Sequence, residues 1–294
     1  MRRRREPRVV MVMLVRDEHD VIALNIRFHA SRGIAAFVVI DNDSADGTYE
    51  IVQGLATEYD IVLQRRVDDR FRQSRWMTEG ALLAYARLGA DLVVLADADE
   101  FWMPEDGGTF AAAFDPAQAL VSCERLNMLV PAAAPFHRAM HCVVNPVAFS
   151  RRSQLEASEI SVGLLAMRDK CMVDPRGLLR VGQGNHSALH TFHWRAVPRA
   201  SGLTIYHYPI RSFAQFARSV ELYRRLLHGG APRLKVGALW RRWAELADPA
   251  AVAAEYRRLS FGRADLALLQ RVGIVETREA PARALARLVT ANRD

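Results

Sequence analysis

The chain has 294 residues, of which half are hydrophobic and a quarter are charged, with 17 glycines and 12 prolines. This composition predicts a globular protein with a substantial core and excludes a disordered, collagen-like or low-complexity chain. The net charge of +7 favours anionic partners, namely nucleotide phosphates, lipid head groups or nucleic acid, without choosing among them. The cysteines, Cys123, Cys142 and Cys171, are too widely spaced for a metal knuckle and fit a reducing compartment.

The first apolar run, Val9–Val15, ends at the charged residue Arg16. It is much shorter than the roughly 18 residues that a membrane-spanning helix needs. A small-residue cleavage site of the kind that follows a signal peptide is also missing there. We therefore expect a protein that is made and kept in the cytoplasm.

The first hundred residues alternate between apolar, β-branched runs and segments whose apolar residues recur at helical spacing. This rhythm is typical of βαβ units with a mainly parallel sheet. It predicts strands at Val9–Val15, Ala36–Ile40, Ile61–Leu63 and Asp91–Ala96, and helices at His19–Ser31, Asp46–Glu58 and Ser74–Leu88.

The pattern is less regular after Phe101, where we expect a mixed extension of the sheet followed by helices. The predicted fold class is therefore α/β, with a mixed sheet that is mainly parallel in the N-terminal half. The domains expected are a basic arm at residues 1–8, a main domain at 9–230 and a helical extension at 231–294. The later elements predicted are strands at Leu120–Val130, His141–Ser150, Leu189–Val197 and Gly202–Tyr208, and a helix at Ser212–His228.

Polar or acidic clusters follow three of the predicted strands. They begin at Arg16, at Asp41 and at Asp97. One such cluster is common, because turns favour Asp and Asn. Three at neighbouring strand ends indicate a ligand site, since ligands of open α/β sheets bind at the carboxyl ends of the strands.

The third cluster, Asp97-Ala98-Asp99-Glu100, contains carboxylates that leave a buried strand together and would repel one another. A divalent cation resolves such repulsion, and Mg²⁺ or Mn²⁺ suits carboxylate oxygens and substrate phosphates. The alternative is a capped turn with solvated acids. In the second cluster, Asp41 is placed to accept hydrogen bonds from a base or ribose, whereas Ser44 and Gly47 fit ordinary turn chemistry.

Together these motifs resemble the GT-A nucleotide-sugar glycosyltransferases, in particular a family 2-like branch that is also similar to family 92. The resemblance rests on Arg16-Asp17-Glu18, on Asp41-Asn42-x-Ser44-x-Asp46-Gly47-Thr48, on Asp97-x-Asp99-Glu100-Phe101 and on the segment Ile205–Ser212. It covers roughly residues 9–228. It implies a catalytic domain with a nucleotide-sugar-binding half at 9–101 and an acceptor half at 102–230. The one departure is Asp17, where such proteins often have Asn.

The resemblance implies roles for individual residues. Arg16, Glu18, Asp41 and the adjoining Asn42 would line the nucleotide site, with Asp41 toward the uracil or ribose. Asp97 would face the ribose and the metal, Asp99 would bind the metal, and His207 would be a metal ligand or a diphosphate contact. We also place Gln73 and Arg211 among the residues that contact the donor.

The other histidines give a weaker pattern. His186, His190 and His193 do not converge as zinc ligands, because Gly182 and Gly184 predict a loop that enters a strand. His186 is the second candidate, after His207, for contact with the metal or the donor phosphates.

A transfer that inverts the anomeric centre needs a carboxylate to deprotonate the acceptor hydroxyl. The resemblance favours inversion. Among several acids placed by position, Asp169 and Asp174 are favoured as this base, and Glu100 is a further candidate. Trp102 follows the acidic cluster and is a candidate for stacking on a sugar ring.

Two other functions remain open at this point. Asp-x-Asp at a strand end is also the nucleophile and acid of a class of phosphohydrolases, but the required lysine is hard to find, since only Lys170 and Lys235 exist. The basic arm Arg2–Arg5, with the amphipathic segment Pro281–Val289, would suit a nucleotide- or membrane-binding protein without catalysis.

We therefore predict a bacterial glycosyltransferase of polysaccharide biosynthesis that uses Mn²⁺ or Mg²⁺ and a nucleotide-sugar donor, with a UDP-sugar favoured. Its acceptor would be a glycan or a lipid-linked precursor. Peripheral contact with an anionic membrane is an additional expectation, and no nucleic-acid motif is present.

Overall fold

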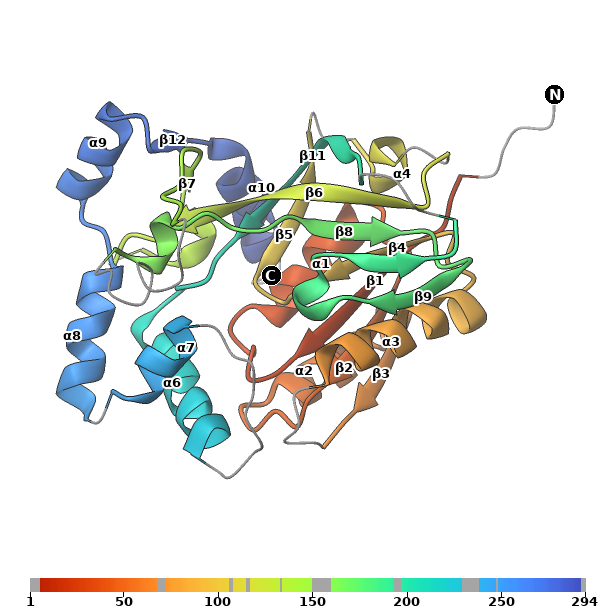
Figure 1. Ribbon diagram of the computed structural model, residues 1–294, viewed down its shortest axis with the longest axis horizontal. Helices are drawn as coiled ribbons and strands as arrows, with labels where there is room; N and C mark the ends of the chain where they lie inside the picture. Colours follow the sequence, from red (N-terminus) through yellow and green to blue (C-terminus); the bar gives the residue numbers. More distant parts are fainter. Residues whose placement is uncertain are drawn as a thin grey trace. The chain divides into compact units, whose positions relative to one another are not determined.

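The computed structural model describes residues 6–67, 72–105, 108–114, 117–132, 134–149, 160–192, 197–228, 238–246 and 248–291 (Figure 1). The chain separates into two units, and the division falls within two of its strands. The first unit comprises Met1–Asp68, Arg72–Arg125 and Arg168–Ile205, and the second comprises Asp69–Phe71, Leu126–Met167 and Tyr206–Asp294.

The first unit is built on four parallel strands. β1 (Val9–Val15) pairs with β2 (Ala36–Asp41) on one side and with β4 (Leu92–Ala96) on the other, and β3 (Ile61–Arg65) pairs with β2. The spatial order of these strands is therefore β4-β1-β2-β3: the chain adds β2 and β3 on one side of β1 and then places β4 on the other side. This reversal of strand order creates the switch point at which open α/β sheets bind ligands.

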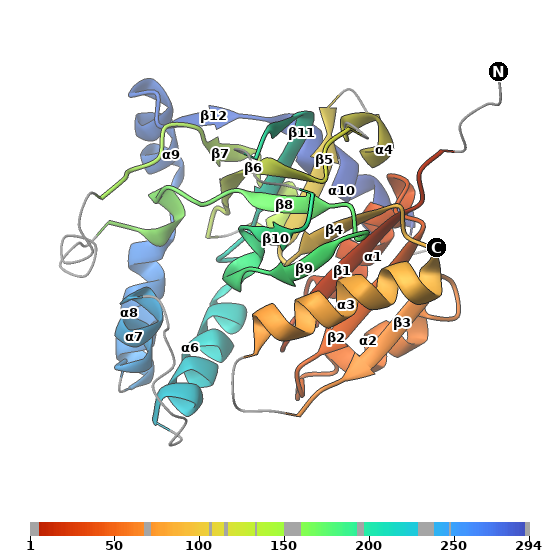
Figure 2. The same ribbon diagram turned by 45° about the vertical axis from the view of Figure 1, so that its right-hand side comes forward.

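Helices cover both faces of this sheet because its central strands are apolar on both sides. α3 (Gln73–Leu88) packs on β1 and β2, as Figure 2 shows, and shares a core with the even-numbered residues of both strands. α1 (Ile22–Ser31) and α2 (Thr48–Leu55) contact each other and connect the first three strands. Gly80 of α3 permits the close approach, because a Cβ there would lie 2.7 Å from the Cγ1 atom of Val12.

Antiparallel strands extend the sheet beyond β4. β8 (Lys170–Val173) pairs with β4, and β6 (Leu120–Leu129) pairs with β8 through its first four residues. β5 (Glu100–Pro104) pairs with β11 (Arg199–His207). The remaining elements of this unit are α4 (Phe110–Ala113), the hairpin of β9 (Leu178–Val181) and β10 (Ala188–His190), and the 3-10 turn η4 (Gln183–Asn185).

The second unit combines a small antiparallel sheet with helices. β7 (His141–Val143) pairs with the end of β6 and with β12 (Val275–Thr277). α6 (Phe213–His228) packs against α7 (Ala238–Ala244) and α8 (Pro249–Leu259) around an aromatic core in which the rings of Phe216 and Trp243 meet edge to face at 5.2 Å. The remaining elements are η2 (Phe136–Arg138), η3 (Val162–Leu164), α9 (Arg263–Arg271) and α10 (Glu279–Ala291).

The predicted fold class is confirmed, and β1 has the predicted bounds. The sequence reading missed four short strands, β5, β8, β9 and β12. β12 also places a strand in the segment 231–294, which was expected to be helical throughout. The amphipathic segment Pro281–Val289 lies in α10, where Leu285 is fully buried and the helix contacts η2 of the same unit. Its apolar face is therefore used inside the protein.

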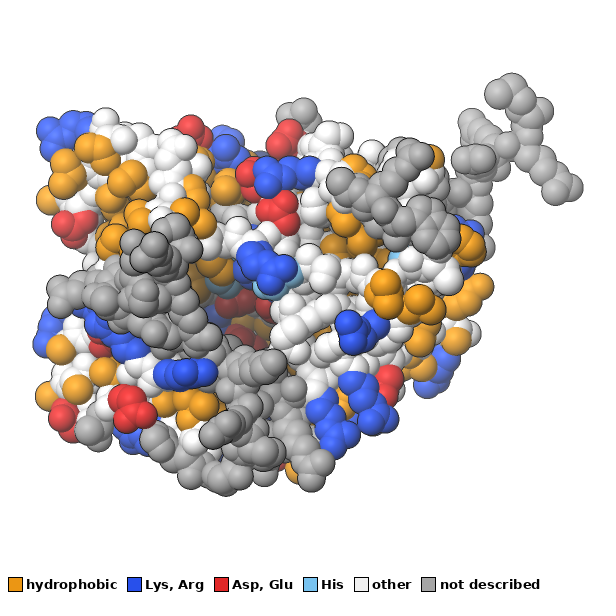
Figure 3. Space-filling model, viewed as in Figure 1, with side chains coloured by type: hydrophobic (Ala, Val, Ile, Leu, Met, Phe, Trp, Pro, Cys, Tyr) orange, Lys and Arg blue, Asp and Glu red, His pale blue; other side chains and the backbone are white. Residues whose placement is uncertain are grey.

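Among the described residues, no helix is long and apolar enough to cross a membrane. On the face drawn in Figure 3, Lys and Arg side chains lie in separate groups among hydrophobic and acidic ones. The predicted basic arm Arg2–Arg5 lies outside the described residues.

Candidate functional site

The loops that follow β1 and β2 are fastened to each other. The backbone N–H of Asp17 donates to Oγ of Ser44 at 3.0 Å, and Oδ1 of Asp17 accepts from the backbone N–H of Ala45 at 2.8 Å. Asp17 and Asp43 both have a left-handed φ of 56°, a conformation that Asn and Asp tolerate better than other side chains. Asp17 is the one departure from the family pattern. Asp, like Asn, tolerates the left-handed backbone and carries an Oδ1 atom that accepts from the backbone N–H of Ala45, so it can replace Asn here.

A second set of contacts continues this fastening into α2. Oδ2 of Asp46 pairs with Nδ1 of His19 at 2.6 Å, and Oδ1 accepts from the Thr48 hydroxyl at 2.5 Å. Burial alone raises the pKa of Asp46, but the hydrogen bonds from Thr48 and His19 outweigh it and lower that pKa. The Thr48 hydroxyl oxygen also accepts from the backbone N–H of Glu18 at 2.8 Å. Glu18 is thus held in place through its main chain.

Three buried polar atoms at these strand ends lack a hydrogen-bond partner among the described residues. They are Oδ2 of Asp41, Oδ1 of Asn42 and Nε of Arg16. Asp41 is fully buried, and its Oδ1 accepts from the backbone N–H of Ser44 at 3.0 Å. Because an unsatisfied buried polar atom is costly, a polar ligand that paired with these atoms at the ends of β1 and β2 would be stabilised there.

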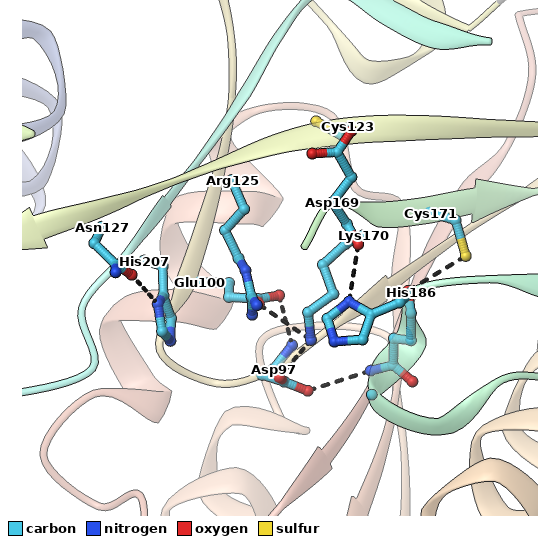
Figure 4. Close-up of polar contacts among 12 residues, drawn as sticks. Asp97, Glu100, Cys123, Arg125, Asn127, Asp169, Lys170, Cys171, His186 and His207 are labelled. Atoms are coloured by element: carbon cyan, nitrogen blue, oxygen red, sulfur yellow. Dashed lines mark hydrogen bonds and ion pairs between the residues drawn. The ribbon is translucent and has the colours of Figure 1, made fainter. Parts of the chain in front are cut away.

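The end of β4 carries a cluster of charges (Figure 4), in which Lys170, Arg125 and Glu100 are buried and a third of the Asp97 side chain is exposed. Nζ of Lys170 lies 2.5 Å from Oδ2 of Asp97 and 3.1 Å from Oε1 of Glu100, and Nη1 of Arg125 lies 2.8 Å from the same Glu100 oxygen. Oε2 of Glu100 accepts from the backbone N–H of Asp97 at 3.1 Å. Burial and the nearby carboxylates raise the pKa of Asp97, and the Lys170 ammonium opposes this shift.

Two residues of α1 hold the backbone of the same acidic segment. The side-chain amide of Asn25 donates to the carbonyl oxygens of Ala98 and Glu100, each at 2.8 Å. Nδ1 of His29 donates to the oxygens of Asn25, so its Nε2 accepts from the backbone N–H of Trp102 at 3.0 Å. Burial lowers the pKa of His29 to about 3. Trp102 is itself fully buried and belongs to the core, which removes it as a sugar-stacking surface.

The glycine loop around η4 meets the charge cluster from another side. Nδ2 of Asn185 donates to Oδ1 of Asp97 at 3.2 Å, and Asn185 has a left-handed φ of 60°. Nδ1 of His186 donates to the carbonyl oxygen of Asp169 at 2.8 Å, so the neutral ring carries its lone pair on Nε2. Burial and the Lys170 ammonium lower the pKa of His186 to about 4. Oε1 of Gln73 accepts from Gln183 and Gly184, so Gln73 supports this loop.

The three predicted bases lie in different surroundings. Glu100 is fully buried between Arg125 and Lys170, so an acceptor hydroxyl cannot reach it. Val93 pairs with Val173 in antiparallel register, so Asp174 lies toward the amino end of β4, at the edge opposite Asp97. Asp169 adjoins Lys170 at the same edge as Asp97. Its two oxygens accept from Arg199 at 3.2 and 3.4 Å, and a quarter of its side chain is exposed.

His207 and Arg211 belong to the second unit. Nδ1 of His207 lies 2.7 Å from Oδ1 of Asn127. The Asn127 amide nitrogen donates to main-chain carbonyls of the η3 segment, so its oxygen is the acceptor and His207 donates from Nδ1. Arg211 is buried and donates from its guanidinium to the carbonyl oxygen of Tyr208 at 3.3 Å. The predicted donor contacts of both residues stay predictions.

Of the predicted metal ligands Asp97, Asp99 and His207, Asp97 has contacts that do not suit a divalent cation, whereas the metal-binding roles of Asp99 and His207 stay predictions. Both Asp97 oxygens already have partners, one of them the ammonium of Lys170, which would repel a divalent cation bound there. Within the described ranges, no group of three or more His, Cys, Asp or Glu side chains is arranged to hold a metal ion. We therefore assign no step to a metal at Asp97.

Sequence reasoning missed three contributors to this site, Lys170, Arg125 and the Asn25–His29 pair. Lys170 lies 73 residues from Asp97 in a four-residue strand, which leaves no periodic signal. The pair on α1 carried a visible signal, because two polar residues at i and i+4 stand on the apolar face of a predicted helix. Trp194, His193 and Lys235 lie outside the described residues.

Residues 24–131 match the model of glycosyl transferase family 2. This segment contains Asp41, Asn42, Gln73, Asp97 and Asp99 and so most of the first unit's strand ends. The match confirms the predicted resemblance and places this segment in a transferase family. A search of curated proteins found no match to the chain.

Two crystal structures illustrate the solved proteins to which the chain is similar. S. aureus TarS 1–349 in complex with UDP is 13% identical, with a TM-score of 0.40 over 81% of this chain and 69% of that chain. Glucosyl-3-phosphoglycerate synthase from Mycobacterium tuberculosis, in complex with Mn²⁺, UDP and glucosyl-3-phosphoglycerate, is 14% identical, with a TM-score of 0.29 over 58% of this chain and 57% of that chain.

Proposed function

We propose that the protein transfers a sugar from a nucleotide-sugar donor, with the nucleoside bound at the carboxyl ends of β1 and β2. The observation that carries this proposal is the buried, unpartnered Oδ2 atom of Asp41. It lies in the segment that matches the family 2 model, and the adjoining loops are fastened to each other by Asp17 and Ser44. A site that is built before ligand arrives loses little entropy on binding.

The donor we favour is a UDP-sugar. The N3–H group of uracil is a hydrogen-bond donor, and the Oδ2 atom of Asp41 is an acceptor that needs one. Cytosine presents a lone pair at the same ring position, which would face the carboxylate unfavourably. A ribose hydroxyl is the alternative donor to Asp41. The unpartnered Nε of Arg16, at the end of the adjacent strand, suits the negative charge of a phosphate.

During transfer, the bond between the anomeric carbon and the diphosphate oxygen breaks, and the acceptor oxygen forms the new bond. In the inverting reaction that the resemblance favours, a carboxylate takes the acceptor proton, and we assign this to Asp169. Asp169 lies at the same edge as Asp97, and its main-chain carbonyl orients His186. The Nε2 lone pair of His186 is then available as a hydrogen-bond acceptor to the substrate. A glycan or lipid-linked acceptor stays a prediction.

The test is incubation of the protein with labelled UDP-, GDP- and CDP-sugars and a mixed glycan and lipid-linked acceptor preparation. Release of UDP with sugar transferred to acceptor supports the proposal. Asp41→Asn should lose this release, because the amide presents a donor where Oδ2 accepted. Asp43→Asn is the matched control, because it is the same substitution in the same loop, it suits the left-handed backbone of Asp43, and the exposed Asp43 side chain pairs with Arg65. Equal loss in both variants would overturn the role of Asp41.

A phosphohydrolase is the second candidate, because the structure supplies the lysine that the sequence reading found hard to place. Lys170 binds Asp97, the first acid of the Asp-x-Asp motif, in the manner that a nucleophilic carboxylate needs. Release of inorganic phosphate from p-nitrophenyl phosphate, lost in an Asp97→Asn variant, would favour this function. Release of UDP from UDP-sugars without phosphate would exclude it.

A further inference from the structure

Lys170 is one of only two lysines in the chain, and its side chain is 1% exposed. A buried ammonium is costly unless it is paired with a carboxylate. Lys170 has two such partners, Asp97 at 2.5 Å and Glu100 at 3.1 Å (Figure 4). The antiparallel pairing of β8 with β4 brings the start of β8 to the acidic end of β4. The pairing of β8 with β4 therefore fixes the position of Lys170 beside Asp97.

Two cations pair with the carboxylates of Asp97 and Glu100. Lys170 pairs with both of them and Arg125 pairs with Glu100, while the nearby Asp99 carboxylate adds a further negative charge that acts on Asp97. The sequence argument for a divalent metal depended on the repulsion between neighbouring carboxylates. At Asp97 that repulsion is already relieved by the ammonium of Lys170. A nucleoside diphosphate that approaches this strand end therefore meets a neutralised carboxylate.

We propose that Lys170 takes the place of a divalent cation at Asp97, so that the protein binds a nucleoside diphosphate without a divalent metal. This inference rests on the proposed nucleotide-sugar function. Lys170 is a positioning residue, because its burial prevents direct contact with a ligand and it acts through Asp97. Asn185 assists by holding the second Asp97 oxygen at 3.2 Å.

The first test uses the unaltered full chain and UDP as the probe. UDP is titrated by calorimetry in EDTA and again in MnCl₂. We expect dissociation constants that agree within about threefold, a difference smaller than 1 kcal/mol. Binding in MnCl₂ that is lost in EDTA would overturn this inference and leave the proposed function standing. Absence of UDP binding in both conditions would instead overturn the proposed function.

The second test compares two substitutions at the same position. Lys170→Met removes the charge and keeps an unbranched chain, whereas Lys170→Arg keeps the charge. In EDTA, Lys170→Met should bind UDP about tenfold or more weakly, because Asp97 and Glu100 lose their shared cation. MnCl₂ should restore most of this loss, and the spin resonance of Mn²⁺ alone should show tighter binding than to the unaltered protein. Lys170→Arg should stay independent of Mn²⁺.

A purely structural role of Lys170 would give a different result. It would weaken UDP binding equally in EDTA and in MnCl₂, and that outcome would overturn the inference. If circular dichroism shows that Lys170→Met does not fold, the double variant Glu100→Gln/Lys170→Met removes one charge of each sign. The double variant should also require Mn²⁺ for UDP binding, because Asp97 still lacks its ammonium.

Discussion

The buried histidine of α1 makes folding stability depend on pH in a calculable way. His29 is fully buried, donates from Nδ1 to Asn25 and accepts at Nε2 from the backbone of Trp102. Burial lowers its pKa from 6.5 to about 3. The unfolded chain therefore binds a proton between these pH values that the folded protein does not bind. The neutral, buried His29 therefore contributes to the free energy of unfolding. This contribution is fully present above pH 6.5 and is lost as the pH falls toward 3.

The size of this effect follows from the two pKa values of His29. Lowering the pH from 6.5 to about 3 would reduce the free energy of unfolding by about 4 to 5 kcal/mol, at 1.36 kcal/mol per pH unit. Between about pH 8 and pH 5, the free energy of unfolding should fall by about 2 kcal/mol through His29 alone. The variant His29→Gln keeps an amide donor and an acceptor but has no proton to gain, so it should lack this part of the slope.

The assay is urea unfolding of the unaltered protein and of His29→Gln at about pH 8, 6.5 and 5. The difference between the two proteins should shrink by about 2 kcal/mol over this range, because only the unaltered protein loses stability through His29. A constant difference between His29→Gln and the unaltered protein at all pH values would refute the reasoning.

Four further substitutions test the packing and charge of the first unit by urea unfolding. Gly80→Ala should destabilise by about 1 to 2 kcal/mol, because the new Cβ would lie 2.7 Å from a methyl group of Val12, and unchanged stability would contradict the close approach of α3. Gly47→Ala should destabilise the protein by about 1 kcal/mol, because Gly47 has a left-handed φ of 92°, although no atom lies within 4 Å of the added Cβ. Gly54→Ala should stabilise it by about 0.5 to 1 kcal/mol, because Gly54 is equally open but lies in a helix. Effects of the same sign in both variants would contradict this explanation. Glu100→Gln should destabilise by about 3 kcal/mol or more, because Lys170 and Arg125 would lose a shared partner, and a neutral result would show that the cluster contributes little.

The parallel half of the first unit was predictable because its signals are local. β1 is a continuous apolar run that ends at a charge, and the acids at the ends of β2 and β4 follow such runs directly. These signals sufficed for the fold class and for Asp41 and Asp97. They also identified Asp17 as a position that needed an explanation, which the left-handed backbone and the bond to Ala45 supply.

The antiparallel extension was less predictable because its partners are distant in sequence. β8 has four residues, and its pairing with β4 decides both that Lys170 meets Asp97 and that Asp174 lies at the opposite edge. No local pattern distinguishes Asp169 from Asp174, since strand direction alone separates them. Likewise, the sequence suggested Glu100 as a candidate base, and only the fold shows it buried between two cations.

The central claim is that the Oδ2 atom of Asp41 accepts a hydrogen bond from the N3–H group of uracil in the donor. Its most direct test is equilibrium titration of UDP and CDP into the unaltered protein, Asp41→Asn and Asp43→Asn. The account predicts that the unaltered protein and Asp43→Asn prefer UDP over CDP by about tenfold or more, and that Asp41→Asn loses this preference. Asp41→Asn that binds UDP with unchanged affinity and preference would contradict the claim.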